Sequence, residues 1–506
     1  MNRATRTLFL PACLALAAAT TAQEGTSTFG QARARELAEL GRLPTRAEVV
    51  VADIVNYHRH RLPLPRAGER ITLDTRFDHA TAAGATLWLQ VGYTTEPAGD
   101  RAFAPPCAVA LAIDCSGSMQ EAGKMSQVKA GLRAFVARLR PDDQIALVPF
   151  ADDAKLLTPL RARGDGAWLD AAIAELEPGG STNLHAGLMR ALRCFDDRAE
   201  APRDRRVILL TDGIANRGVT EPDRIVDDAN DWTRRGISLA TIGVGQSLDV
   251  RLLQRLAQGA HGLFHFVADG DDVQKVFVDE AAALVTALVR DVTLRVELPP
   301  GLVVLRACHE GVRLSTDGCE VTLPDLGTGV TGVLMLQCRA DDVAADASVT
   351  ATLRATAADD GSQIVRKSKA RLAVGRSYRV QQGDTIDTIA RKLYGDRRRG
   401  EALRRDNPDV DFQRLVIGQQ LRLGGDDVDL EVRKNAAIAA LAQGLADMAV
   451  ANDARRWAEA DRALRLASDE ATRLFPGDDQ DLQRTRDLVA GHRRTLARYL
   501  DRFRDD

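Results

Sequence analysis

The chain has 506 residues, of which 45% are apolar and 27% are charged, and its 68 basic residues nearly balance its 71 acidic residues. This length predicts several domains, and the composition is typical of globular proteins rather than of disordered, collagen-like or integral membrane proteins. Nucleic-acid binding is not expected, because the charges nearly cancel and aromatic residues make up only 4% of the chain.

Residues 1–22 have the pattern of a secretory signal peptide. Arg3 and Arg6 precede a short apolar run, Thr7 to Ala19, and small residues follow that run. The run is too short to span a bilayer as a helix, and no later segment is long and apolar enough. We therefore expect an exported protein of the periplasm, cell wall or extracellular space, without a transmembrane segment. Lipidation at Cys13 is an alternative use of the same segment.

Six of the seven cysteines would remain after cleavage of the signal peptide. They are Cys107, Cys115, Cys194, Cys308, Cys319 and Cys338. An oxidising compartment permits disulfides among them, but buried free thiols agree with the sequence equally well. No two of them have C-x-x-C spacing, so neither a zinc ribbon nor a thioredoxin-type site is indicated.

Residues 105–290 alternate between strand-like and helical patterns, as an α/β sheet requires. Apolar runs predict strands over Ala108–Asp114, Gln144–Phe150, Val207–Thr211, Ile237–Val244 and Leu263–Val267. Amphipathic stretches predict helices over Met125–Leu139, Trp168–Leu176, Leu184–Phe195, Val226–Arg235 and Val250–Ala257. We expect a doubly wound α/β domain, whose ligand site lies in loops at the carboxyl ends of its strands.

Three of these loops carry carboxylate and hydroxyl side chains. The first predicted strand ends at Asp114, and Ser116 and Ser118 follow it. Thr182 lies in a glycine-rich loop ahead of a predicted helix, and Asp212 directly follows another predicted strand. Oxygen ligands with little formal charge suit a hard cation that keeps waters in its shell. The sequence therefore predicts a Mg²⁺ or Mn²⁺ site at this edge of the sheet.

The pattern Asp-x-Ser-x-Ser, a distant Thr and then Asp-Gly resembles the metal-ion-dependent adhesion site of von Willebrand factor type A domains. The resemblance implies that Ser116, Ser118 and Thr182 bind the metal directly or nearly so, while Asp114 and Asp212 act largely through coordinated water. It also implies that an acidic side chain of a protein partner completes the metal's shell. The low charge of the ligands would keep the ion electrophilic towards that carboxylate.

Residues 23–104 form an N-terminal region in which Thr72–Phe77 and Thr86–Tyr93 alternate as strands do. His58 and His60 form an H-x-H pair, but no third ligand lies nearby in the sequence. We therefore expect this pair to lie in a solvated basic turn rather than in a metal site.

Residues 291–376 are expected to form an all-β sandwich. Runs rich in Val, Thr and Leu predict strands over Val292–Leu298, Leu302–Ala307, Val321–Leu323, Val330–Gln337 and Val349–Ala355. Turn residues separate these runs, as in antiparallel sheets. A structural or partner-docking role is expected for this unit.

Residues 377–425 predict a small βααβ unit. A strand beginning at Tyr378 is followed by helices Ile386–Leu393 and Glu401–Arg405, and a second strand is expected over Leu415–Leu423. This run resembles a LysM module, which implies binding of peptidoglycan or another N-acetylglucosamine glycan. The resemblance places the glycan between two lips, formed by Gly383, Asp384, Thr385 and Ile386 and by Asn407, Leu415, Val416 and Ile417. A spacer without glycan binding is the alternative.

Residues 428–506 are helical by composition and periodicity, and Pro476-Gly477 separates helices expected over Ala458–Leu474 and Leu482–Phe503. A helical hairpin or a three-helix unit for packing or oligomerisation is expected.

The sequence shows no nucleophile elbow, no H-E-x-x-H motif and no P-loop, so an enzyme is not expected. We interpret the chain as an exported cell-envelope protein that binds an acidic residue of a protein partner through a metal ion and attaches to peptidoglycan. The alternative is a periplasmic scaffold or assembly factor, in which the α/β domain organises a complex and the βααβ unit only positions it.

Overall fold

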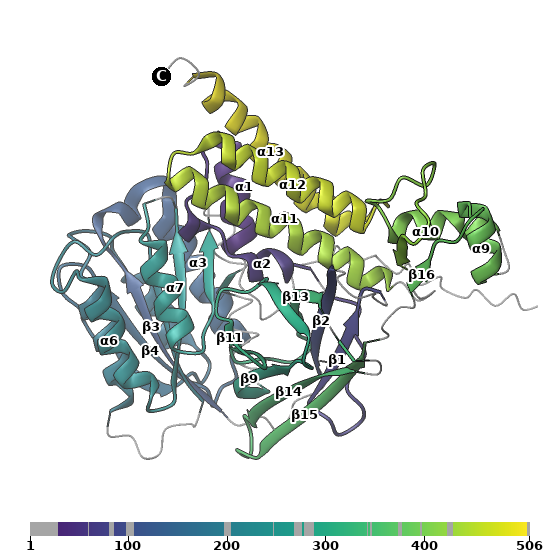
Figure 1. Ribbon diagram of the computed structural model, residues 1–506. Helices are drawn as coiled ribbons and strands as arrows, with labels where there is room; N and C mark the ends of the chain where they lie inside the picture. Colours follow the sequence, from purple (N-terminus) through teal and green to yellow (C-terminus); the bar gives the residue numbers. More distant parts are fainter. Residues whose placement is uncertain are drawn as a thin grey trace, which may run out of the picture.

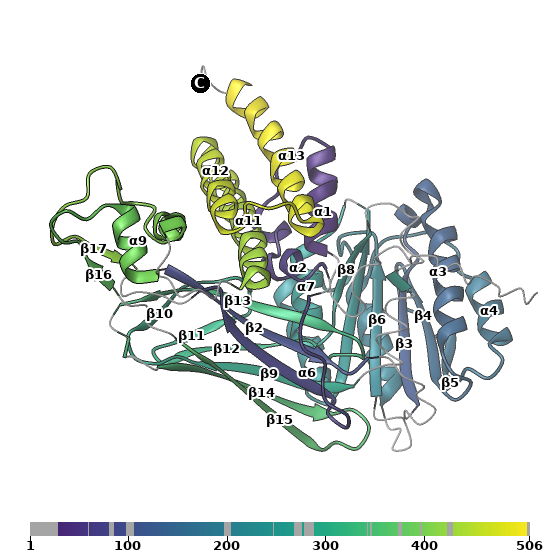
Figure 2. The same ribbon diagram turned by 90° about the vertical axis from the view of Figure 1, so that its right-hand side faces the viewer.

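The computed structural model describes residues 29–58, 60–79, 86–97, 106–196, 204–245, 247–267, 276–277, 288–341, 343–344, 347–372, 377–394, 397–422 and 429–502. The expected signal peptide and the alternative lipidation at Cys13 lie outside the described residues. Figures 1 and 2 show an α/β domain at one end, two β-sheets beside it, a layer of helices above them and a small unit at the opposite end.

The α/β domain contains a six-stranded sheet in the order β5-β4-β3-β6-β7-β8. Its strands are β3 (Cys107–Asp114), β4 (Gln144–Phe150), β5 (Thr158–Ala162), β6 (Asp204–Thr211), β7 (Ile237–Val244) and β8 (Phe264–Val267). All neighbours are parallel except β5, which pairs antiparallel with β4. The predicted α/β fold is therefore confirmed, with the addition of β5. Its exposed positions and Pro159 hide this short edge strand in the sequence.

Helices cover both faces of this sheet. Along β3, Ala108, Ala110 and Ala112 contribute to one hydrophobic cluster, while the intervening residues contribute to a second. The helices are α3 (Lys124–Arg138), α4 (Ala167–Ala174), α5 (Leu184–Leu192), α6 (Pro222–Thr233) and α7 (Val250–Gly259). Buried residues of α5, α6 and α7 join the first cluster, and those of α3 and α4 join the second. Because successive strand side chains point to opposite faces, β3 is buried on both.

Two further sheets share a single hydrophobic cluster. One has the order β1-β2-β13-β10 and the other the order β11-β12-β9-β14-β15. Their strands are β1 (Ile71–Phe77), β2 (Thr86–Thr95), β9 (Val289–Glu297), β10 (Leu302–Ala307), β11 (Arg313–Ser315), β12 (Gly318–Thr322), β13 (Thr331–Ala340), β14 (Ser348–Ala357) and β15 (Gln363–Arg371).

The β-sheet part of the molecule includes strands from both sides of the α/β domain in the sequence. Strand β2 pairs antiparallel with β13, so that Leu89 faces Leu336 and Val91 faces Leu334. The expected boundary at residue 104 therefore does not separate the N-terminal strands from the later β region. Each strand has a local signature, but its partner lies more than 200 residues away in the sequence.

The segment that contains α1 (Phe29–Glu39) and α2 (Val51–Val55) joins the parts of the molecule. Helix α1 contacts both β8 and α13, and α2 contacts α11. The largely buried Arg33 guanidinium lies 2.6 Å from Glu36 and 2.7 Å from Glu48. It also stacks 5.2 Å above the ring of Phe266 in the α/β domain. A paired arginine that packs on an aromatic ring can be buried at an interface at low cost.

Three helices form the C-terminal region: α11 (Leu430–Asp453), α12 (Trp457–Leu474) and α13 (Gln480–Arg502). The three-helix alternative is therefore correct and the two-helix hairpin is not. Figures 1 and 2 show these helices above α2 and the sheet that contains β2 and β13, with α1 beside α13. No helix among the described residues is both long and apolar enough to cross a membrane.

A small unit contains β16 (Ser377–Arg379), α9 (Ile386–Tyr394), α10 (Gly400–Asp406) and β17 (Gln420–Arg422). Strands β16 and β17 pair antiparallel, so the chain order is β-α-α-β. The strand expected over Leu415–Leu423 is shorter than predicted, because residues 416–419 form a turn that is closed by the amide of Gln419 donating to the carbonyl of Val416 at 3.0 Å. In this turn the amide of Gly418 donates to the carbonyl of Val380, at 2.8 Å.

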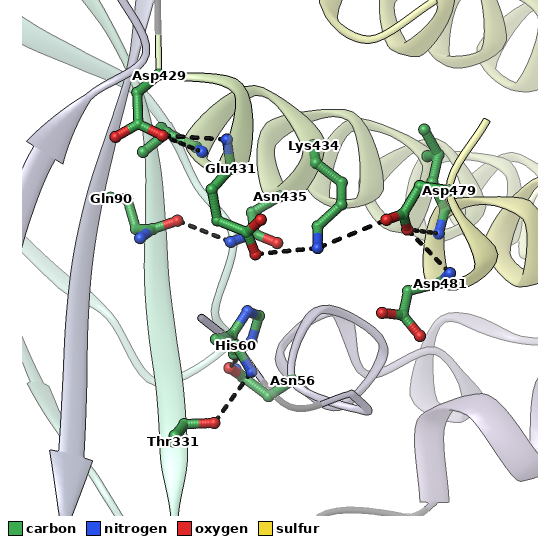
Figure 3. Close-up of polar contacts among 12 residues, drawn as sticks. Asn56, His60, Gln90, Thr331, Asp429, Glu431, Lys434, Asn435, Asp479 and Asp481 are labelled. Carbon is green, nitrogen blue, oxygen red and sulfur yellow. Dashed lines mark hydrogen bonds and ion pairs between the residues drawn. The ribbon is translucent and has the colours of Figure 1, made fainter. Parts of the chain in front are cut away.

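The segment around His58 and His60 is buried, so the expectation of a solvated basic turn was wrong. His58 is 8% exposed and His60 3%, and their ring centres lie 4.5 Å apart. Figure 3 shows His60 between Asn56 and the α11 residue Asn435. The two histidines flank an arginine in the sequence, which suggested a basic surface turn, but α11 covers them in the folded chain.

The six described cysteines are free thiols, five of them buried and Cys194 partly exposed. The structure therefore favours the free-thiol alternative for these residues. Burial raises the pKa of Cys115, Cys308 and Cys338 to about 12 each. Such thiols behave as small apolar side chains rather than as nucleophiles.

Candidate functional site

The central strands β3 and β6 lie side by side and parallel, and both end at the same edge of the sheet. The chain leaves β3 towards β4 on one side and later returns as β6 on the other side. This makes the carboxyl end of β3 and β6 the point at which the winding of the sheet reverses. Asp114 ends β3 and Asp212 directly follows β6, so the fold brings these two predicted site residues to that point.

Asp114 is fully buried and connects the two loops. Its Oδ1 accepts a hydrogen bond from the amide of Ser116 at 2.8 Å, and its Oδ2 accepts one from the hydroxyl of Thr211 at 2.6 Å. Burial raises the pKa of Asp114, and the bonds from Thr211 and Ser116 oppose that rise. The nearby charge of Asp212 raises the pKa of Asp114 further. Thr211 was not singled out from the sequence, although it ends a strand beside Asp212.

Ser116, Ser118 and Asp212 form a chain of hydrogen bonds. The two serine hydroxyl oxygens lie 3.2 Å apart, and the hydroxyl of Ser118 donates to Oδ1 of Asp212 at 2.7 Å. Ser116 and Asp212 are buried and Ser118 is partly exposed. The three side chains therefore converge on one point near the surface.

Lys124 was missed in the sequence analysis. Its Nζ lies 2.6 Å from Oδ2 of Asp212 and 3.5 Å from the carbonyl oxygen of Ser118. Lys124 begins α3, and the sequence signal that could have indicated it is a lysine at the start of the helix that follows the serine loop. The ammonium of Lys124 thus lies directly against one of the two carboxylates of the site.

Thr182 lies in a loop that contacts both other loops. The amide of Thr182 donates to Oδ1 of Asn216 at 2.8 Å, and the amide of Asn216 donates back to the carbonyl of Thr182 at 3.1 Å. The Thr182 hydroxyl lies beside Gly213, since a Cβ built on that glycine would be 3.3 Å from Oγ1. The amide of Gly117 donates to the carbonyl of Gly180 at 3.0 Å. All five predicted metal ligands are therefore at one edge of the sheet.

Comparison with known proteins agrees with this arrangement. Residues 108–279 match the family of the von Willebrand factor type A domain. The α/β part of the chain is a von Willebrand factor type A domain. Over 286 residues the chain is 28% identical to the uncharacterized protein YfbK of Escherichia coli K12, covering 54% of this chain and 49% of that protein.

Two further relatives extend the comparison. Inter-alpha-trypsin inhibitor heavy chain H1 of Sus scrofa is 29% identical over 231 residues, which cover 42% of this chain and 24% of that protein. The chain thus spans about half or less of the curated relatives that it matches. A solved von Willebrand factor type A protein from Catenulispora acidiphila aligns with a TM-score of 0.50 and 18% identity, covering 81% of this chain and 90% of that one. That likeness concerns the fold.

The donor atoms of the von Willebrand factor type A domain fit a hard cation. Among the described residues, no group of three or more His, Cys, Asp or Glu side chains is placed to hold a metal ion. The oxygens that converge at this edge, and that could hold a cation, are hydroxyl oxygens and the carboxylates of Asp114 and Asp212. Such a set of oxygen donors suits Mg²⁺ or Mn²⁺ better than zinc, which takes nitrogen and sulfur ligands in most protein sites.

The predicted glycan-binding residues of the βααβ unit fall into two groups. Three of these residues stabilise the unit itself: Asp384, Ile386 and Asn407. The Asp384 carboxylate accepts hydrogen bonds from the hydroxyl of Tyr378 at 2.6 Å, the ammonium of Lys392 at 2.7 Å and the amide of Gln381 at 2.7 Å. With its side chain 1% exposed, Asp384 has little surface to offer a ligand.

Ile386 is 9% exposed within the small hydrophobic core, and the buried Asn407 donates to the carbonyl of Leu403 at 2.8 Å. These two positions are structural because the helices pack over them.

The other group lies at the surface. Gly383 and Thr385 are exposed, and Leu415 is half-buried against the core. Val416 and Ile417 are 66% and 65% exposed at the turn before β17. Apolar side chains with this exposure have no packing role in the unit itself.

Proposed function

We propose that the von Willebrand factor type A domain binds Mg²⁺ or Mn²⁺ through Asp114, Ser116, Ser118, Thr182 and Asp212. Through the bound ion it would bind an acidic side chain of a protein partner. The observation that carries this proposal is the hydrogen-bonded chain from Ser116 through Ser118 to Asp212 at the edge of the sheet. These oxygens already converge, so little reorganisation is needed to place them around one cation.

Each residue has a separate task in this proposal. The hydroxyls of Ser116, Ser118 and Thr182 donate lone pairs without adding charge. Asp114 fixes the serine loop through the Ser116 amide, and Asp212 contributes its carboxylate, largely through water. The ion, when bound, supplies a positive centre that attracts the partner's carboxylate. Binding, rather than catalysis, is the function that this arrangement supports.

We further propose that the two β-sheets form a sandwich that carries the domain, and that the βααβ unit is a LysM module. Its ligand would be peptidoglycan or another N-acetylglucosamine glycan. The exposed Val416 and Ile417 support this, because apolar side chains at a surface turn can pack against the apolar faces of sugar rings. The chain would then be an exported protein of the periplasm, cell wall or extracellular space.

A scaffold or assembly factor of the periplasm is the second candidate. In that case the same metal site would hold a component of the cell's own envelope machinery, and the βααβ unit would only position the protein. The identity of proteins recovered in the experiment below separates these candidates, since a binding protein of the surface would recover extracellular or surface proteins.

The metal site is tested by calorimetric titration of the purified chain with Mg²⁺ and Mn²⁺. We expect binding by the wild type and none by Asp114→Ala or by the double variant Ser116→Ala, Ser118→Ala. Ser181→Ala is the matched control, because Ser181 lies in the same loop as Thr182 and its amide and side chain bond to Asp152 rather than to a predicted metal ligand. Partner capture from an envelope extract should require the metal and disappear with EDTA. Capture that is unchanged by EDTA and by Asp114→Ala would disprove the mechanism.

The glycan proposal is tested by sedimentation with purified peptidoglycan. We expect the wild type to sediment and the double variant Val416→Ser, Ile417→Ser to remain in solution. Leu466→Ser is the control, since Leu466 is an equally exposed apolar residue, 62% exposed, on α12. If neither the wild type nor the variants sediment, the βααβ unit is a spacer.

A further inference from the structure

Lys124 is held in place beside Asp212 from several directions. Its Nζ lies 2.6 Å from Oδ2 of Asp212, whose side chain is completely buried, while the Lys124 side chain is only 18% exposed. A Cβ built on Gly245, which follows β7, would lie 3.5 Å from Cε and 3.6 Å from Nζ of Lys124. The lysine stem therefore passes closely over a glycine, at which φ is +81°. The competing carboxylate of Glu121 lies 3.9 Å away and is 76% exposed.

We propose that Lys124 sets the charge of the metal site, so that a bound divalent ion keeps a net positive charge and recognises an external carboxylate. This inference rests on the proposed metal-binding function and adds to it a residue that controls specificity. Lys124 contacts no metal in this proposal, but acts through Asp212 as a positioning residue.

The charges of the site carry the argument. Asp114 and Asp212 together would cancel the two positive charges of Mg²⁺ or Mn²⁺, and a neutral complex attracts a carboxylate only weakly. With the ammonium of Lys124 against Asp212, one positive charge remains after the metal binds. Because the site is largely buried, these charges are poorly screened by water. The cost is a weaker affinity for the metal itself, since a cation already occupies one side of Asp212.

The test measures metal affinity and carboxylate affinity separately in the full-length chain. Lys124→Met removes the charge and keeps most of the length of the side chain, and Lys124→Arg keeps the charge. We expect Lys124→Met to bind Mg²⁺ about tenfold more tightly than the wild type, because a unit charge a few ångströms away shifts an ionic equilibrium by about that factor or more. Lys124→Arg should stay within about threefold of the wild type, by the same Coulomb estimate.

The carboxylate readout uses acetate as the probe and the relaxation of water protons on protein-bound Mn²⁺ as the signal. Acetate should displace Mn²⁺-bound water from the wild type and from Lys124→Arg, and at least about tenfold less effectively from Lys124→Met. The control is Lys129→Met, because Lys129 lies on the same helix and its Nζ donates to the carbonyl of Ala174 rather than to a predicted metal ligand.

The outcomes separate the two proposals. If the wild type binds neither metal, the proposed function itself fails. If it binds metal and Lys124→Met has unchanged affinity, Lys124 does not set the charge and only this inference fails. Weaker metal binding by Lys124→Met would likewise overturn it, since the lysine would then serve to order Asp212. Thermal unfolding of each variant shows whether a loss of binding comes from a loss of folding.

Discussion

Nε2 of His60 lies 3.0 Å from Oδ1 of Asn56, and this contact determines the protonation of the ring. The amide nitrogen of Asn56 donates to the carbonyls of Ala52 and Val333, so its Oδ1 can only accept. Nε2 of His60 must then carry the proton, and Nδ1 is left as the site that a second proton would occupy. In the neutral ring beneath α11, the tautomer protonated at Nε2 is therefore the one that fits.

Lowering the pH should destabilise the fold through this buried pair. Burial lowers the pKa of His60 well below 6.5, and the charges of His58 and Lys434 lower it further, while Asn435 opposes them. Burial also lowers the pKa of His58, and Asp481 and Asp479 oppose that shift. The unfolded chain takes up protons near pH 6.5, before the folded chain does, so stability is complete above that pH and is lost below it.

The urea midpoint should therefore fall between pH 7.5 and pH 5. For each such histidine the unfolding free energy should fall by about 1.4 kcal/mol per pH unit below pH 6.5, until the folded-state pKa is reached. Burial lowers the pKa of His492 to about 4, so this residue adds a loss of the same sign down to that pH. His60→Gln keeps a donor for Asn56 and cannot take up a proton, so it should show a smaller fall. An equal fall in His60→Gln and in the wild type would contradict the assignment to His60.

Thr211→Val should weaken the site without removing a predicted metal ligand. The Thr211 hydroxyl is a donor to the buried Oδ2 of Asp114, at 2.6 Å. Its loss leaves that oxygen without the hydroxyl donor, which should cost about 1–3 kcal/mol of unfolding free energy. Chemical denaturation measures the loss, and calorimetry should show weaker Mg²⁺ binding. Thr211→Ser keeps the hydroxyl and should behave nearly as the wild type does; a loss equal to that of Thr211→Val would instead point to the missing methyl group.

Gly187→Ala should destabilise the α/β domain at the edge that carries the site. A Cβ at Gly187 would lie 2.4 Å from Cδ1 of Phe150, whose ring is buried. The carbonyl of Phe150 accepts from the amide of Cys115 in the serine loop, at 2.7 Å. Overpacking of this kind costs about 1–3 kcal/mol. The melting temperature should fall, whereas it should hardly change in Gly179→Ala, because a Cβ there meets nothing within 4 Å.

Asp384→Asn should loosen the βααβ unit and leave the α/β domain unchanged. The substitution removes the charge that Lys392 and the Tyr378 hydroxyl contact at 2.7 Å and 2.6 Å. Hydrogen exchange should accelerate over residues 377–422 by a factor that corresponds to about 1–3 kcal/mol. Asp387→Asn, an exposed carboxylate on α9, is the control. Faster exchange across the whole chain would mean that the unit does not open independently.

Local sequence patterns were sufficient to predict the parallel strands of the α/β domain. Strands β4 and β7 have the predicted bounds, and β3 and β6 begin earlier than predicted but end as expected. These strands could be predicted from the sequence because each is an apolar run that is buried on both faces of the sheet. The loops with Asp114 and Asp212 follow directly from the strand ends, so their meeting at one edge could be predicted from the parallel order alone.

Contacts between distant segments could not be predicted in this way. The pairing of β2 with β13 has no local signature, and the position of Lys124 at the start of a helix does not show that it contacts Asp212. The burial of Ile386 and Asn407 could not be predicted either, because an isoleucine and an asparagine fit a glycan-binding groove as well as a core.

The sequence alone determined the α/β fold, the residues at the edge of its sheet and the helical character of the C-terminal region, because period, polarity and strand ends are local properties. Only the tertiary structure decided that His58 and His60 are buried, that β1 and β2 join the later strands and that Lys124 pairs with Asp212. Burial and charge pairing depend on which surfaces meet, and that is decided by packing between segments that lie far apart in the sequence.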